Sequence, residues 1–328
     1  MKMKGKLIIG AILAILASAS WGSMYPIAES ALVHIDPFYF ALVRYIPIAI
    51  IFSVVLFIVE GKAAFRSEGN FVHIIFFGIM GFTVYNLFIF WGQHLLGGEG
   101  VILASVMESL SPVISILVIW IVYRQKVHKF TIVVIIGAFI GVLLVITKGE
   151  MSSLLAFNRL IPLLILLIAA GGWAFYTIGG SRFPDWSVLR YSTLSVIYGT
   201  IISTLVILVI SAMGLVPIPK LEAIYDIRFH IIYMILIPGL LSILLWNQAV
   251  VFLKPINTIL FINVAPITTI IIQAIQGHAI SHFELIGVAI VCLMIVLNNL
   301  HQRWEIKRRK ASDAEIEDEA QLLNPEDY

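Results

Sequence analysis

A single carboxylate lies where the sequence is otherwise almost entirely apolar. The stretch ASVMESLSPVIS, residues 104–115, places Glu108 four residues before Pro112 inside a long hydrophobic run. A charge at the centre of a bilayer costs at least about 2.5–3.5 kcal/mol on insertion scales, so such a group needs a task or a partner. It can bind a proton or the cationic group of a substrate, or it can link two helices by hydrogen bonds. At a depth of about 12 Å into its helix, we favour the first.

Two prolines open the helical backbone beside polar side chains. Pro112 cannot donate a hydrogen bond to the carbonyl four residues earlier, which is that of Glu108 itself. Pro266 leaves the carbonyl of Ile262 free in the same way, next to Asn263. Both prolines therefore predict a helix break with a small polar pocket.

Aromatic side chains recur at comparable places in the two parts of the chain. They predict a cavity for planar or cationic substrates, although aromatic belts at the membrane surface are the alternative. Asn86 and Asn263 can add hydrogen bonds to a substrate, and contacts between helices explain them equally well. The aromatic candidates are Trp21, Tyr25, Tyr85, Trp173, Tyr176 and Trp246.

Two arginines lie within or at the edge of apolar segments. Arg44 has no countercharge in its own segment, and the candidate partners elsewhere are Glu29, Asp36 and Glu108. Arg190 begins a later apolar segment. Each arginine can serve as a gate or an anion contact, or it can fix the depth of its helix at the interface, and both alternatives remain open.

We expect neither a metal site nor a nucleotide-binding or catalytic motif in this sequence. His278 and His282 have the spacing of two ligands on one helix face, but only Glu284 lies nearby as a third, so we expect no metal site. Nothing resembles a P-loop, a zinc-protease motif or a nucleophile elbow. We therefore expect a protein that is not an enzyme, binds no cofactor or nucleic acid, and does not use ATP directly.

The elements that carry these residues are membrane-spanning helices. Of the 328 residues, 60% are hydrophobic and only 12% are charged, against about 25% charged in soluble domains. Runs of about 20 apolar residues span a bilayer. The sequence predicts an all-α protein with ten such helices, although closely spaced later segments leave eight or nine open. The segments are 7–26, 39–59, 71–93, 100–122, 130–147, 159–180, 190–213, 229–251, 255–275 and 283–300.

The basic residues predict the orientation. With ten helices, fifteen lysines and arginines fall on the side of the N-terminus and four on the other. The positive-inside rule then places both termini in the cytoplasm and the chain in the cell membrane. The N-terminus resembles a secretory signal, but cleavage would invert this charge distribution, so we expect none. Residues 303–328 read as a charged, disordered cytoplasmic tail.

Landmarks recur in the same order in residues 1–150 and 151–302, which predicts two five-helix repeats. An odd number of spans per repeat requires the second repeat to be inverted, as in many secondary transporters. Chance similarity between apolar segments is the alternative explanation. The paired landmarks are Trp21 with Trp173, Arg44 with Arg190, and Pro112 with Pro266.

Three stretches resemble a known family. WGSMYPIAESALVHIDPFYFALVRY from residue 21, GGEGVILASVMESLSPVISIL from residue 97 and GAFIGVLLV from residue 137 are similar to the drug/metabolite transporter superfamily, in its ten-helix EamA-like branch. Gln125 stands where the family often has a glutamate, and Met24 where it often has asparagine. Any role of that glutamate therefore cannot be transferred to this chain.

These patterns, with the resemblance, predict a secondary active transporter. We expect it to export small organic metabolites, such as amino acids or amphipathic drugs, by alternating access at a central cavity, and Glu108 allows coupling to protons. Arg44 is the one clear candidate for a buried cationic side chain, whereas phosphate binding usually needs several, so phosphorylated substrates are disfavoured. A membrane receptor or assembly factor is the alternative, and the repeats argue against it. The patterns leave open whether the chain is a monomer or a homodimer.

Overall fold

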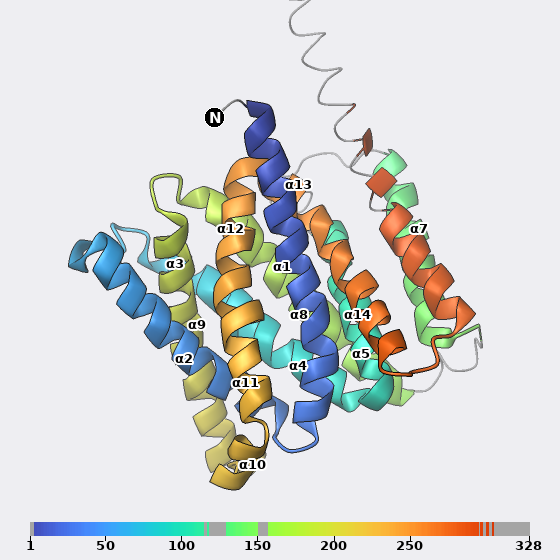
Figure 1. The fold of residues 1–328 in the computed structure, drawn as a ribbon, viewed down its shortest axis with the longest axis horizontal. Coiled ribbons are helices and arrows are strands. Elements are labelled where there is room, and N and C mark those ends of the chain that lie inside the picture. The colour runs from blue at the N-terminus through green and yellow to red at the C-terminus, as the bar shows by residue number, and fades with distance from the viewer. Residues whose placement is uncertain are drawn as a thin grey trace, which may run out of the picture.

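A computed structural model describes residues 3–114, 117, 129–149, 157–294, 296–297, 300–301 and 304. The described residues form helices joined by short turns, without a strand among them. Figure 1 shows the helices lying roughly side by side as a bundle. The long helices are α1 (Met3–Leu32), α2 (Pro37–Glu60), α4 (Tyr85–Leu95), α7 (Lys129–Thr147), α8 (Phe157–Gly179), α9 (Val188–Ala212), α12 (Ser242–Leu253) and α14 (Val264–Ile275). The shorter helices are α3 (Phe71–Gly78), α5 (Gly100–Glu108), α10 (Leu221–Asp226), α11 (Arg228–Met234) and α13 (Pro255–Thr258).

Six helical segments of the described chain are long and apolar enough to cross a membrane. They are Gly5–Leu32, Pro37–Glu60, Phe71–Leu95, Leu160–Arg182, Val188–Ala212 and Arg228–Leu253. Three shorter apolar helices cover Ile132–Val145, Phe261–Ile275 and His282–Met294. The segment predicted over 100–122 lies partly outside the described residues, as does the tail predicted over 303–328. The chain is thus a multi-pass membrane protein.

The first turn between helices shows how local sequence defines their ends. The predicted segment 7–26 ends too early, because α1 continues through Pro26 to Leu32. Asp36 then caps α2, its carboxylate accepting a hydrogen bond from the backbone N–H of Phe38 at 2.8 Å. Pro37 occupies the first helical position, where the missing N–H costs nothing.

Two of the spans contain a π-helical turn at corresponding places. Segment η2 (Ile79–Val84) interrupts the span between α3 and α4, and η6 (Ile235–Leu241) interrupts the span between α11 and α12. In each, a side chain bonds the carbonyl five residues earlier: Asn86 to Gly81 at 2.9 Å, and Ser242 to Ile237 at 2.8 Å. A π turn adds one residue and so rotates the following helix by roughly 100°, and such turns concentrate at functional sites.

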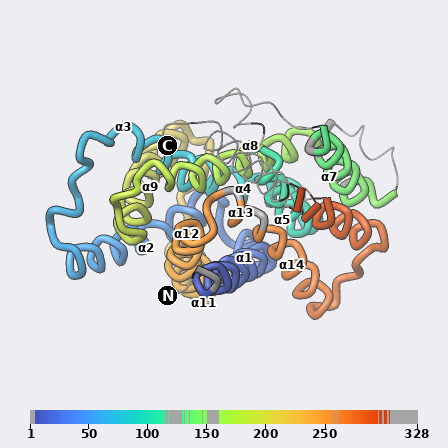
Figure 2. Tube along the Cα trace, turned by 90° about the horizontal axis from the view of Figure 1, so that it is seen from above, coloured from blue at the N-terminus to red at the C-terminus, as the bar shows by residue number. Residues whose placement is uncertain are grey.

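Helices that pack on each other have counterparts that do the same when each helix is replaced by its equivalent in the other half of the chain. Helix α1 packs on α12, as α8 packs on α4; α1 also packs on α14, as α8 packs on α5. Helices α2 and α9 pack on each other. Viewed along the bundle, α2, α3 and α9 lie at one end, α7 and the last helix at the other, with α1, α4, α8 and α12 between them (Figure 2).

Glycines permit the closest of these crossings. A Cβ on Gly141 of α7 would lie 2.7 Å from the carbonyl oxygen of Gly287, and one on Gly287 would lie 2.5 Å from that of Gly141. A Cβ on Gly199 of α9 would likewise lie 2.4 Å from the carbonyl oxygen of Gly78. Small residues let membrane helices approach until their backbones touch, which compensates for the weak hydrophobic drive in lipid.

Candidate functional site

Glu108 lies in the centre of the bundle with none of its surface exposed. Its carboxylate accepts hydrogen bonds from two tyrosine hydroxyls, Tyr25 of α1 to Oε2 and Tyr85 of α4 to Oε1, the latter at 2.6 Å. Within the described chain it forms no ion pair. Three helices therefore meet at one carboxyl group whose partners are both neutral.

The backbone at Glu108 is interrupted as the position of Pro112 requires. Helix α5 ends at Glu108, a turn covers residues 109–110, and helical residues resume from 111 to 114. The hydroxyl of Ser111 donates to the carbonyl of Glu108 at 2.7 Å, which satisfies the acceptor that the proline leaves open. This donor was not among the predicted site residues, although its place beside the proline is a usable signal.

A similar interruption precedes Pro266 in the second half. The 3₁₀ segment η7 (Ile259–Asn263) stands directly before α14. Asn263 is buried, and its carbonyl lies 3.8 Å from the thiol of Cys292, which is close enough for a weak sulfur hydrogen bond. The second break thus lies against the last helix, and its Asn263 carbonyl faces a thiol, whereas the Glu108 carbonyl of the first break accepts from a hydroxyl.

Three tryptophans form a cluster beside the carboxylate. Trp21 lies 4.8 Å from Trp173 and 5.0 Å from Trp246 between ring centroids, both edge to face. The indole N–H of Trp21 donates to the carbonyl of Pro238, in the π turn η6, at 3.0 Å. Helices of both halves therefore meet at Trp21. In this conformation the rings fill the space between them, and the predicted cavity remains a prediction.

Aromatic rings connect this cluster with both sides of the site. Trp173 lies 5.0 Å from Tyr85 and 5.1 Å from Tyr176 between centroids. The indole N–H of Trp173 is buried and finds no acceptor among the described residues. Tyr85 joins the cluster to the carboxylate, whereas Tyr176 continues it in the opposite direction.

The network around Tyr176 includes residues that the sequence did not mark. Asn247 donates to the hydroxyl of Tyr176 at 2.7 Å and to Ser192 at 2.8 Å. Tyr191 stacks on Tyr176 at 5.3 Å and donates to its carbonyl at 2.7 Å. Tyr191 follows Arg190 as Tyr45 follows Arg44, so the pairing of the two arginines was a signal for Tyr191, but the sequence carries none for Ser192.

Arg44 is buried in an uncharged environment. Its Nη2 donates to Asn86 Oδ1 at 2.7 Å, and its guanidinium lies 4.8 Å from the ring centroids of both Tyr45 and Phe90. In the part of the chain that the structure describes, it makes no ion pair within 4.0 Å. The acidic partners considered from sequence, Glu29, Asp36 and Glu108, are therefore not its partners here.

Arg190 lies at the opposite end of the site and does have a countercharge. It pairs with Glu68 at 3.0 Å, donates to the carbonyl of Arg66 at 2.6 Å and stacks on Trp186. The hydroxyl of Ser187 donates to Glu60 at the end of α2. These contacts join the start of α9 to the connection between α2 and α3.

The contact between Arg190 and Glu68 depends on pH. The hydrogen bond from Arg190, followed by that from Trp186, lowers the pKa of the Glu68 carboxyl from its ordinary value. A lowered pKa means that the contact is fully present above the ordinary value of about 4.5 and is lost as pH falls through the lowered one. The contact between Arg190 and Glu68 is therefore present at neutral pH.

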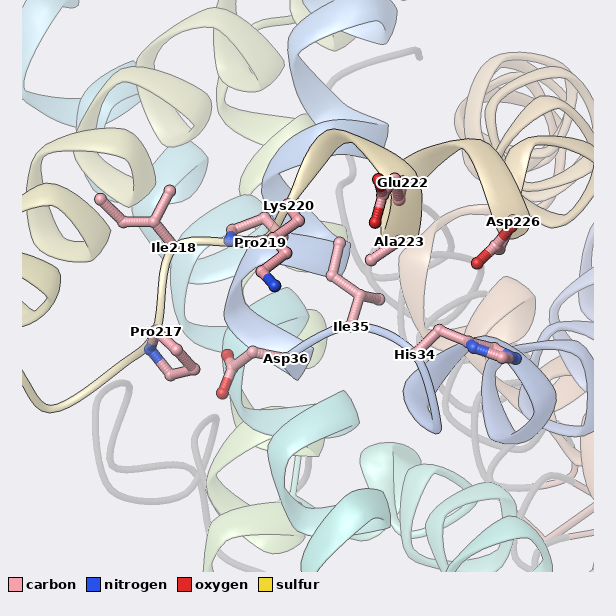
Figure 3. A pocket seen from close by; sticks show the side chains of 10 residues that line it. All are labelled: His34, Ile35, Asp36, Pro217, Ile218, Pro219, Lys220, Glu222, Ala223 and Asp226. Atoms are coloured by element: carbon pink, nitrogen blue, oxygen red, sulfur yellow. The ribbon is translucent and has the colours of Figure 1, made fainter.

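One surface pocket lies apart from the buried groups described above. It encloses about 370 Å³ between residues 34–36, in the turn after α1, and residues 217–226, which include α10 (Figure 3). None of the predicted site residues lines it. Lys220, Glu222 and Asp226 give it mixed charge, so it is a polar surface depression, distinct from the buried site.

The histidine pair does not gather a third ligand. Among the described residues, no three His, Cys, Asp or Glu side chains lie close enough to hold a metal ion. Glu284 instead accepts the backbone N–H of Ser281 at 2.7 Å and lies 3.6 Å from Lys148. Its carboxylate caps the last helix.

Two stretches of the chain, residues 8–147 and 160–300, each match the EamA-like transporter family. The chain belongs to that family. Two proteins of Bacillus subtilis (strain 168) are similar to this EamA-like chain over most of their length. One, named "Uncharacterized transporter YrdR", is 42% identical over 303 residues, which are 92% of this chain and 94% of that protein. The other, named "Uncharacterized transporter YyaM", is 26% identical over 276 residues, 84% of this chain and 88% of that protein.

A solved crystal structure shares the fold of the EamA-like chain. It covers 92% of this chain and 98% of its own, with a TM-score of 0.63 at 17% sequence identity. The double match to one family agrees with the exchange of packing pairs between the two halves. The resemblance found in the sequence is thus confirmed, and the chain is a membrane protein of a transporter family.

The tyrosine bonds at Glu108 can be tested by a double-mutant cycle. Tyr85→Phe removes a donor from a buried carboxylate, so we expect a loss of about 1–3 kcal/mol in unfolding free energy. In a Glu108→Gln background the same change should cost less, because the acceptor no longer carries charge, and the coupling should lie within about 0.5–3 kcal/mol. Denaturation in detergent measures both.

The exposed Tyr225 provides the control for this cycle. Tyr225→Phe should change stability by less than about 0.5 kcal/mol in either background. Equal costs of Tyr85→Phe in both backgrounds would show that the carboxylate does not depend on this hydroxyl.

Proposed function

We propose that this EamA-like protein is a secondary active transporter that exports small organic metabolites or amphipathic drugs by alternating access at the site around Glu108. The observation that carries the proposal is the fully buried carboxyl group held by Tyr25 and Tyr85, which Tyr85 connects to the tryptophan cluster. A charge of this kind, facing the interior of a membrane bundle, marks substrate or proton pathways.

Protonation of Glu108 would change how three helices are joined. In the ionised form, the carboxylate accepts a bond from each hydroxyl. A proton on either oxygen converts that oxygen into a donor, and the facing tyrosine must then accept or rotate away. The link from α5 to α1 or to α4 is thereby altered, which gives proton binding a direct effect on helix packing.

The tryptophan cluster supplies the second part of the proposed site. It contains rings from α1, α8 and α12, so any substrate between these rings would touch both halves. The free indole N–H of Trp173 is available to an acceptor on the substrate. Aromatic faces favour planar or cationic groups, which fits the proposed substrate classes.

The contacts of Arg190 would form the inner closure of this transporter. In the proposed topology, ten helices form two inverted repeats with both termini in the cytoplasm, and Arg190, Glu68 and Glu60 lie at the cytoplasmic end. Alternating access then requires these contacts to open when the site faces inward.

Reporter fusions test the topology. A reporter joined after residue 310 should be cytoplasmic, and a tag inserted within residues 214–228 should be external. If both report the same side, the ten-helix arrangement is wrong.

Substrate flux in proteoliposomes tests the function. A metabolite panel should reveal at least one compound whose uptake responds to a pH gradient. Glu108→Gln preserves side-chain volume and can still hydrogen-bond, but it cannot release a proton. It should abolish the response to the gradient while counterflow, which needs no net proton movement, persists. Gradient-driven transport equal to wild type in the variant would exclude Glu108 as the coupling group.

A further inference from the structure

Arg44 is a buried cation without a countercharge among the described residues, which raises the question of which anion it binds. It is only 2% exposed, and each oxygen or sulfur partner it has is neutral: Asn86 Oδ1 at 2.7 Å and Met234 Sδ at 3.9 Å. The rings of Tyr45 and Phe90 cover the guanidinium. Removing one charge from water without an opposite charge is strongly unfavourable, and aromatic faces compensate only in part.

The guanidinium retains unused hydrogen-bonding capacity. Of its five N–H donors, one on Nη2 has an oxygen acceptor, and the Nε–H has no partner among the described residues. A planar fork with free donors matches a carboxylate, which it can bind through two parallel hydrogen bonds. An arginine that only fixed helix depth would extend to the surface, whereas this one is enclosed.

The position of Arg44 connects it with Glu108. Asn86, which holds Arg44, directly follows Tyr85, which holds Glu108, and both come immediately after the π turn η2. The guanidinium of Arg44 and the carboxyl group of Glu108 are thus each bonded to a neutral residue at the start of α4. These two residues are consecutive, so they lie on different faces of the helix. Met234 belongs to the second half, so Arg44 also lies where the two halves meet.

We propose that Arg44 binds the carboxylate of the transported compound, so that the substrates are zwitterionic or anionic carboxylates. The proposal rests on the transport function proposed above and names its substrate class. When the halves separate, the carboxylate replaces Asn86 Oδ1 as the acceptor of the guanidinium. Asn86 keeps its own bond to Gly81, so the exchange leaves the π turn intact.

Binding to matched pairs of compounds tests this assignment. The probes are leucine, phenylalanine and tryptophan, each with its amide, which has nearly the same size but no carboxylate. Equilibrium binding is measured on the full chain in detergent, so it does not depend on transport. Wild type should bind at least one acid more tightly than its amide. Arg44→Gln should weaken acid binding about tenfold or more and change amide binding less than about twofold.

Two further variants separate binding from folding. Arg44→Lys keeps the charge but loses the planar fork, so acid binding should fall between wild type and Arg44→Gln. Arg228→Gln removes an arginine that lies over the Tyr225 and Phe229 rings outside the site, and it should leave both compounds unaffected. Melting temperatures of all variants report whether the fold is retained.

Three results would overturn the assignment: no acid binds to wild type, amides bind as tightly as acids, or Arg44→Gln weakens both compounds equally. The last outcome would make Arg44 a structural cation. Failure of transport is a different result. Acids that bind through Arg44 but are not moved in counterflow would refute the proposed function and leave the binding assignment standing.

Discussion

The structure depends on one constraint: a carboxylate at the centre of a membrane bundle must be satisfied by groups from several helices at once. Glu108 meets it with two tyrosine hydroxyls, from α1 and α4, and with no cation. Neutral donors stabilise the charge without cancelling it. Two breaks in the helices lie beside these groups. The proline break ends α5 at Glu108, and the π turn η2 comes directly before Tyr85, where α4 begins. Under the proposed function, this arrangement lets the site respond to a proton or a substrate.

The aromatic cluster extends this constraint across both halves. Trp21 contacts Trp173 and Trp246 and bonds the backbone of η6. Aromatic side chains bury large areas and favour edge-to-face pairs, so these rings hold the helices that carry them together. Tyr85 connects the two parts of the site, because it bonds Glu108 and its ring contacts that of Trp173. The packing pairs are matched between the two halves, as the proposed alternating-access function requires of two related repeats.

Sequence patterns predicted the helical class, the family and most of the groups that meet at the centre. Glu108 and Trp21 stood out because polar or bulky residues deep in apolar runs have few explanations. The partners of Arg44 and Arg190 could not be predicted, since contacts such as Arg190 with Glu68 join residues far apart in the chain. The π turns were also missed, because one added residue within an apolar run leaves no mark on its hydrophobicity.

The central claim is that the two ends of the bundle open in alternation around Glu108. Spin labels on exposed residues test it most directly, one pair at Lys62 and Asp185 and the other at His34 and Glu222. Double electron–electron resonance gives the distance within each pair at high and low pH in nanodiscs. The account predicts that one distance lengthens as the other shortens, and that Glu108→Gln removes the response. Distances that rise together, or a full response in the variant, would contradict it.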